Sequence, residues 1–171
     1  MTRPARSISE LLDPECYGGK AAWLSRLHAV GLRVPDAIVF PACNEATFES
    51  IKFDLIYAKA TRTLLAPFCA ADGTYEVAIR SSATIEAGAA ESLAGHFETF
   101  LGRFSFDDVL ARVCSVYRQG FGVLKNHEGM IAVIVQRMIN ASFAGVYFSA
   151  NPLTSSRNAV APVVRTVFGD F

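Results

Sequence analysis

The sequence predicts an α+β fold in which helices and β-hairpins are mixed. Three segments, residues 21–30, 44–65 and 104–121, place apolar side chains at helical spacing. Short runs rich in β-branched and aromatic residues lie between and after them, as is typical of strands. Hydrophobic residues make up 51% of the 171 positions, which is ample for a packed core. We therefore expect roughly five or six strands and three helices, in one domain or a large part of one.

The first helix is predicted to follow the glycine pair Gly18-Gly19 and to end before Gly31. Lys20 would then lie at the start of this helix, where its ammonium group beside exposed backbone N–H groups suits a phosphate. A solvated lysine after a turn is the alternative. The predicted apolar face of the helix consists of Ala21, Ala22, Trp23, Leu24, Leu27 and Val30.

A short strand is predicted over residues 37–40, and the second helix over residues 44–65, with Asn44 as its cap. Pro67 should end this helix. The turn Asp72-Gly73 then leads into the next strand.

The stretch over residues 77–99 carries the chemistry. It begins as a buried strand and then presents Arg80, Ser81, Ser82 and Thr84, followed by a loop of small residues that closes at Gly95. A guanidinium group, hydroxyls and closely spaced backbone N–H groups can surround a phosphate. The alternative is a strand end with a polar turn.

Residues 97–102 alternate as expected of a strand that returns beside the first, with Glu98 and Thr99 on opposite faces. Residues 104–121 form the third predicted helix, with Ser105 as its cap. Residues 130–138 read as a buried strand, and residues 143–149 as its partner in a hairpin. Another strand is predicted within residues 160–168.

Composition excludes several classes of protein. Sixteen basic and sixteen acidic residues cancel, so no general attraction to nucleic acid or to an anionic membrane surface is expected. The four cysteines include no C-x-x-C pair, which argues against a zinc knuckle and for reduced thiols. The N-terminus has no apolar leader, and no window approaches the roughly 18 apolar residues of a membrane span. We expect a soluble, cytoplasmic protein.

Five sequence blocks, in this order and spacing, resemble the N-terminal nucleotide-binding region of the phosphoenolpyruvate synthase, pyruvate phosphate dikinase and rifampicin phosphotransferase family. The blocks are G-G-K-A-A-x-L-x-x-L-x-x-x-G-L-x-V-P, A-I-R-S-S-A-T-x-E, S-x-A-G-x-x-E-T-F-L, V-Q-R-M and A-G-V-x-F-S-A-N-P-L-T. Together they span residues 18–154. The resemblance implies an ATP-grasp fold, in which two α+β subdomains clamp ATP.

The resemblance also implies roles for individual residues. Lys20 and Arg80 would hold the nucleotide phosphates and act in catalysis, and Gln136 and Met138 would lie against adenine. The phosphate-facing loops would contain Ser81, Ser82, Thr84, Gly95 and Thr99. For Arg137, whose side chain points away from those of its two neighbours on a strand, a surface ion pair is as plausible as a ligand contact.

The chemistry that the family implies is ATP-dependent phosphoryl transfer. The β-phosphate passes to a histidine on a separate domain and then to pyruvate or another small acceptor. Such transfer needs cations and N–H donors around the triphosphate. Mg²⁺ is expected as well, with its ligands in a second half of the ATP-binding region that lies outside this chain.

The resemblance assigns residues 1–171 to the N-terminal part of such a domain, incomplete at its C-terminal end, with residues 1–8 expected to be a flexible arm. The expected partners are ATP and the missing half, histidine domain and acceptor domain, in cis or in trans. The chain alone would hold a nucleotide without completing transfer, and its uncovered end would include Val163, Val164, Val167 and Phe168. The alternative is a non-catalytic, stand-alone nucleotide-binding or interaction module.

Overall fold

A computed structural model describes residues 3–50, 55–85, 97–125, 128–142, 144–146 and 163–165. The chain divides into two compact units, Met1–Met138 and Ile139–Phe171.

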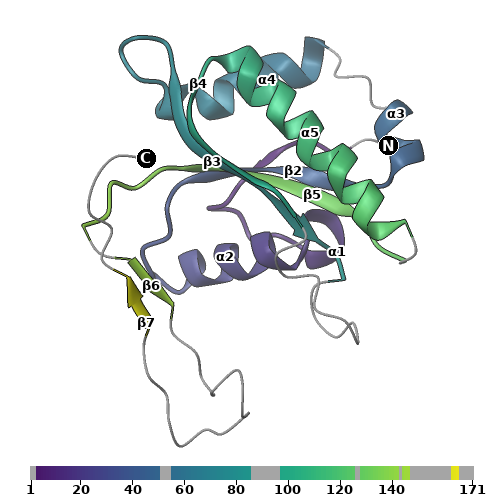
Figure 1. The fold of residues 1–171 in the computed structure, drawn as a ribbon, viewed down its shortest axis with the longest axis horizontal. Coiled ribbons are helices and arrows are strands. Elements are labelled where there is room, and N and C mark those ends of the chain that lie inside the picture. Colours follow the sequence, from purple (N-terminus) through teal and green to yellow (C-terminus); the bar gives the residue numbers. More distant parts are fainter. Residues whose placement is uncertain are drawn as a thin grey trace, which may run out of the picture. The chain divides into compact units, whose positions relative to one another are not determined.

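The first unit is built on a five-stranded sheet in the order β1-β2-β5-β3-β4, with every neighbouring pair antiparallel. Its strands are β1 (Arg6–Ser7), β2 (Ala37–Cys43), β3 (Tyr75–Ala83), β4 (Thr99–Phe104) and β5 (Ile131–Arg137). The central strand β5 is buried at every position except Arg137, as its β-branched run predicts. Figure 1 shows this twisted sheet with helices on both faces.

One face of the sheet is covered by helix α5 (Phe106–Leu124). Ser105 caps it as predicted, since its hydroxyl accepts a hydrogen bond from the Asp108 amide at 3.1 Å. Val109, Val113 and Val116 point to the sheet and are buried against β3 and β5. This packing forms the larger hydrophobic core.

The predicted second helix is observed as α3 (Glu45–Ser50) and α4 (Leu55–Leu65), and residues 51–54 between them lie outside the described residues. Asn44 caps α3 as predicted, because its side-chain oxygen accepts from the Thr47 amide at 2.9 Å. The chain then forms a 3₁₀ turn, η1 (Ala66–Phe68), which contains Pro67. Both α3 and α4 contribute to the core beneath α5, through Phe48 and Leu65.

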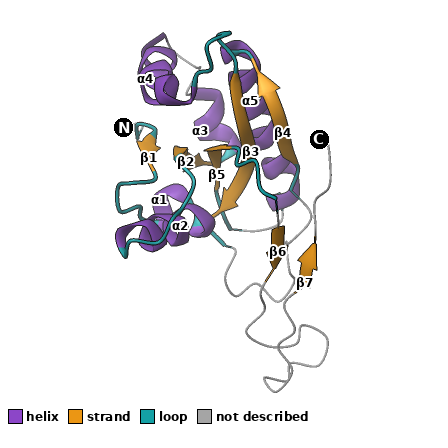
Figure 2. Ribbon diagram, turned by 90° about the vertical axis from the view of Figure 1, so that its left-hand side faces the viewer, coloured by secondary structure: helices purple, strands orange, loops and turns teal. Residues whose placement is uncertain are grey.

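The opposite face carries α1 (Pro14–Tyr17), which packs mainly on β2 and β5, and α2 (Gly19–Ala29), which packs mainly on β3 (Figure 2). The predicted apolar face of α2 is wrong in part. Ala21, Ala22 and Ser25 are buried, whereas Trp23, Leu27 and Val30 remain 61%, 39% and 74% exposed. The small residues and the partly buried Leu24 occupy the contact with the sheet, whereas the other large residues of the predicted face stay exposed.

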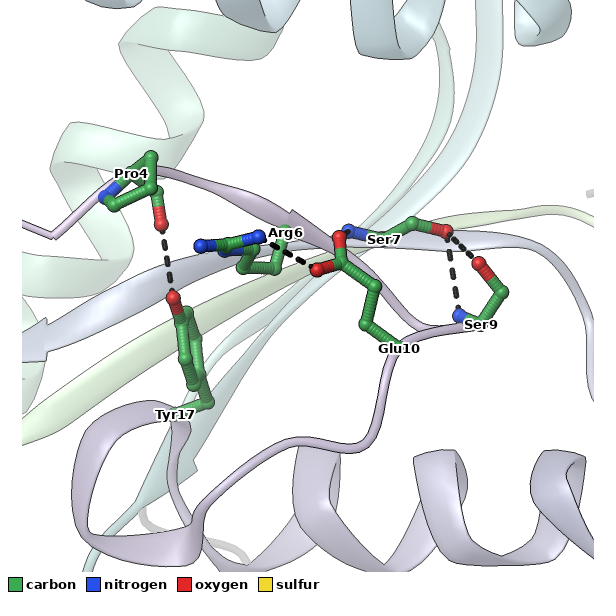
Figure 3. A network of polar contacts seen from close by, with 6 residues as sticks. All are labelled: Pro4, Arg6, Ser7, Ser9, Glu10 and Tyr17. Carbon is green, nitrogen blue, oxygen red and sulfur yellow. Dashed lines mark hydrogen bonds and ion pairs between the residues drawn. The ribbon is translucent and has the colours of Figure 1, made fainter.

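The N-terminal segment is tied to this unit. β1 pairs with β2, the Tyr17 hydroxyl donates to the Pro4 carbonyl oxygen at 3.0 Å, and the Arg6 guanidinium donates to the Glu10 carboxylate at 2.7 Å (Figure 3). Ile8 is 1% exposed. The expectation of a flexible arm over residues 1–8 therefore missed a strand and a core residue.

In the second unit, β6 (Ala144–Val146) pairs with β7 (Val163–Arg165). The predicted hairpin between residues 130–138 and 143–149 is wrong. Both edges of β5 are already occupied, by β2 and β3, so no edge is left for a further strand. The apolar end predicted at residues 163–168 lies outside the described side chains. Across the described chain, the α+β prediction is confirmed as a mixture of helices and antiparallel sheet.

Candidate functional site

Strand register places several of the predicted site residues on one face of the sheet. Arg80 lies directly opposite Thr99 on β4 and opposite Ile134 on β5. Residues that face each other across antiparallel strands share a face. Ile134 belongs to the core under α1 and α2, so Arg80 and Thr99 also point to the α2 face.

Gln136 extends this face along β5. It is opposite Ala78 and two residues beyond Ile134, which returns its side chain to the same face. Its side chain is buried. The Met138 amide donates to the Glu76 carbonyl oxygen at 3.0 Å, so β5 keeps its contact with β3 one residue past its end.

Lys20 reaches the same region from α2. Its ammonium nitrogen donates to the Ser81 carbonyl oxygen at 3.0 Å, across 61 residues of sequence. Ser81 directly follows Arg80 in β3. The hydrogen bond therefore brings the Lys20 ammonium to the backbone next to Arg80, the second predicted phosphate-binding cation. Lys20 and Arg80 are both half-buried, which limits their freedom without removing them from solvent.

The strand that carries Arg80 is longer than predicted. β3 continues through Ser81 and Ser82 to Ala83, so these serines lie inside a central strand and not in a loop after it. Ser81 is opposite Val133, a member of the core under α5, and its side chain therefore points to the face away from Lys20. Ser82 points to the α2 face, where its hydroxyl oxygen accepts from the Ala21 amide at 3.0 Å.

Thr84 and Gly95 are not part of this group as described. The Thr84 hydroxyl accepts from the Met130 amide at 2.9 Å and lines an open pocket that also contains Glu45 and Glu128. The lining carries these two carboxylates against one ammonium group, that of Lys125, so its net charge is negative and does not favour a phosphate. Gly95 lies outside the described residues.

Comparison with known proteins identifies the family. Residues 46–170 match the family model described as pyruvate phosphate dikinase, AMP/ATP-binding domain. The chain belongs to this family. The match contains Arg80, Thr99, Gln136 and Met138, and it confirms the resemblance that the sequence blocks predicted.

Three relatives illustrate the range of this dikinase family. A phosphoenolpyruvate synthase of Pyrococcus furiosus is 38% identical over 97 residues, which cover 49% of this chain and 12% of that protein. The prodigiosin synthesizing transferase PigC of Serratia marcescens is 30% identical over 186 residues, covering 90% of this chain and 20% of that protein. A rifampicin phosphotransferase of Bacillus subtilis is 32% identical over 95 residues, covering 49% and 11%.

The chain thus spans between 11% and 20% of the length of these relatives. The PigC alignment, which covers 90% of the chain, must extend to residues before position 46, where the family-model match begins. Similarity to the family therefore reaches toward α2, the helix that carries Lys20.

Arg137 makes the surface contacts that the sequence left open. Its guanidinium lies 3.7 Å from the Asp36 carboxylate, donates to the Pro67 carbonyl oxygen at 2.5 Å and sits 5.4 Å from the centre of the Phe68 ring. The ion-pair interpretation is confirmed for this dikinase-family domain. Arg137 is held away from its neighbour Gln136, as strand alternation requires.

Sequence reasoning missed Leu101. It lies opposite Ala78 on the α2 face, in the same cross-strand row as Gln136, and is 55% exposed. An exposed leucine and a buried amide, on either side of Ala78, offer the apolar surface and polar group that a flat ring requires. The alternation of β4, which puts Thr99 and Leu101 on one face, could have indicated it.

An ion pair between β3 and β4 lies on the same face of the sheet as Arg80. Glu76 lies on the same face of β3 as Arg80 and pairs with Arg103, directly opposite on β4, at 3.7 Å. Within the described ranges, no group of three or more His, Cys, Asp or Glu residues could hold a metal ion. None of the described helices has the length and apolar character that a membrane span requires.

Proposed function

We propose that this chain binds ATP on the α2 face of the sheet, as the nucleotide-binding part of an ATP-dependent phosphotransferase of the dikinase type. One observation carries the proposal: the Lys20 ammonium is anchored 3.0 Å from the carbonyl oxygen of the residue after Arg80. The family's AMP/ATP-binding domain supports the nucleotide. Two held cations on one face provide the charge that a triphosphate requires.

Within this proposal, Lys20 and Arg80 bind phosphate oxygens, and the exposed Thr99 hydroxyl opposite Arg80 adds a donor. Gln136 and Met138 face the adenine, with Leu101 as an apolar support. The side chains of Ser81 and Ser82 are 2% and 0% exposed, so they do not supply direct phosphate contacts. The site thus extends from the start of α2, across β3, to the end of β5.

We infer an ATP-grasp arrangement in which a second subdomain closes over this face. In the complete protein, the β-phosphate would pass to a histidine of another domain and on to pyruvate or another small acceptor. The residues described here would hold and neutralise the triphosphate, because stabilisation of spread negative charge dominates such transfer. Mg²⁺ would be held by groups outside them.

The test is titration of the chain with ATP and Mg²⁺, followed by titration of the Lys20→Ala and Arg80→Ala variants. Each variant should weaken binding by about 1–3 kcal/mol, the loss expected for one charge-assisted contact. Arg26→Ala is the matched control, since Arg26 is an exposed cation on the same helix and lies 5.1 Å from the Trp23 ring centre. Equal affinity of wild type, Lys20→Ala and Arg80→Ala would remove both residues from the site.

A further inference from the structure

The turn before α2 lies directly against β3. Gly18 has a φ of 77°, and a Cβ atom at this position would lie 2.1 Å from the Ser82 carbonyl oxygen and 2.4 Å from the Ser82 hydroxyl oxygen. No side chain fits in that space, because real Cβ atoms essentially never approach another heavy atom so closely. The start of α2 is therefore seated on one point of the strand, and that point is Ser82.

Ser82 also supplies the cap that α2 lacks locally. The first N–H groups of a helix have no partner within it, and the N-cap side chain usually satisfies one of them. Here the N-cap residue is Gly18, which has no side chain to do so. The amide of Ala21, the third residue of α2, donates instead to the Ser82 hydroxyl oxygen at 3.0 Å.

This contact fixes where Lys20 lies. Lys20 directly precedes Ala21, and its ammonium group donates to the carbonyl oxygen of Ser81, directly before Ser82. Ser82 and Arg80 are two residues apart on the same face of β3, about 6.5 Å along the strand. A helix start that is pinned at Ser82 therefore keeps the Lys20 ammonium at a set distance from the Arg80 guanidinium.

We propose that Ser82 is a positioning residue, which acts through the first turn of α2 to hold Lys20 beside Arg80 and does not contact the nucleotide itself. The inference rests on the proposed function for the role of Lys20 and Arg80. The Ser82 side chain is fully buried, and its oxygen is engaged by the Ala21 amide, so it is directed to the helix and not to a ligand.

The test compares Ser82→Ala with wild type by two readouts. Hydrogen exchange at the Ala21 amide should become faster, because this N–H loses its acceptor. The dissociation constant for ATP with Mg²⁺ should rise roughly two- to tenfold, the change that corresponds to loss of one neutral hydrogen bond. Should Ser82→Ala fail to fold, Ser82→Cys preserves the shape of the side chain with a much weaker acceptor and takes its place.

Ser25→Ala is the matched control. The Ser25 hydroxyl is also buried on α2 and accepts a backbone amide, from Leu12 at 3.1 Å, but it lies more than one helical turn beyond Lys20. Ser25→Ala removes a buried hydroxyl that accepts a backbone amide, as Ser82→Ala does, but it removes it from α2 itself and not from β3. It should lower stability to a similar extent and leave the affinity for ATP unchanged.

Double variants separate positioning from direct contact. In a Lys20→Ala background, Ser82→Ala should cause no further loss of ATP affinity, whereas in an Arg80→Ala background it should still weaken binding. Equal losses in both backgrounds would overturn the inference in favour of a direct contact. Unchanged exchange at the Ala21 amide would overturn it while the proposed ATP site stands. If Lys20→Ala and Arg80→Ala bind ATP like wild type, the proposed function fails, and the positioning role fails with it.

Discussion

Cys43 ends β2 and is 3% exposed, in the core beneath α5. Burial raises the pKa of its thiol to about 12, against a smaller opposing effect of the hydrogen bond with Tyr117. A cysteine in an unfolded chain ionises near pH 8.5. Above that pH the unfolded state therefore holds fewer protons than the folded state, and the free energy of unfolding should fall as the pH rises toward 12.

The measurement is denaturant unfolding of wild type and Cys43→Ala between pH 7.5 and 11. Below pH 8 wild type should be the more stable, since the variant leaves a small cavity. At higher pH the advantage of wild type should shrink, by at most about 1.4 kcal/mol per pH unit. Other groups titrate in both proteins alike, so two stability curves that stay parallel would contradict the prediction.

At this scale, the sequence predicted residue types better than residue roles. Lys20 and Arg80 were identified because a cation after a glycine turn and a cation in a strand are visible in the chain. The role of Ser82 was not, because its partner is the Ala21 amide, 61 residues away. The direction of the Ser81 side chain was not predicted either. It depends on β3 continuing to Ala83, and the polar residues of this stretch had suggested that the strand ends earlier.

α5 and β5 pack closely at Gly120. A Cβ atom there would lie 2.4 Å from Cγ1 and 2.9 Å from Cδ1 of Ile131, which is fully buried and central in the sheet. Gly122, two residues later, is exposed, and a Cβ atom there would meet nothing within 4 Å. The two glycines therefore form a matched pair on one helix.

Gly120→Ala should destabilise the protein by about 1–3 kcal/mol, because the helix or Ile131 must shift to admit the methyl group. Gly122→Ala should stabilise it by up to about 1 kcal/mol, since alanine is the better helix former. Thermal or urea unfolding of both variants measures the difference. If both substitutions change the stability in the same direction, helix propensity, and not packing against β5, determines the effect of Gly120→Ala.

Elements with one strong signal were predicted well. Ser105 and the valine stripe defined α5, and the β-branched run of residues 130–138 defined β5. The face of α2 was misjudged because hydrophobicity was taken as the sign of burial, whereas a close helix-to-sheet contact selects small residues such as Ala21 and Ala22. β1 was missed because two residues are too short for any periodicity.

For the whole molecule, pairing order was the part that the sequence could not provide. Each predicted strand overlaps an observed one, but the hairpin was assigned to the nearest strand in the chain, whereas β5 pairs with β2 and β3, more than 40 residues before it. Such long-range pairing depends on which apolar faces meet, and local turn signals do not report it. The candidate site depended on the same pairing, because it brings Arg80, Thr99 and Gln136 onto one face.

The fragment 1–138 should fold by itself. It is the first of the two compact units, it contains all five strands of the large sheet, and both described core clusters consist of its residues. It also contains Lys20, Arg80 and Gln136, so it should retain part of the ATP affinity of the full chain. Cooperative urea unfolding, with a steep single transition, is the expected result.

A fragment that ends at residue 128 is the control. It is only ten residues shorter than the fragment 1–138, but it lacks β5, whose loss separates β2 from β3 and removes the buried residues at positions 131–135 from the two cores. Their apolar surface contributes about 1.5–3 kcal/mol for each large side chain, so the shorter fragment cannot remain folded. It should show neither cooperative unfolding nor ATP binding. If the fragment 1–138 also shows neither cooperative unfolding nor ATP binding, residues 139–171 are needed to fold the sheet of the first unit. The two units would then be one cooperative structure.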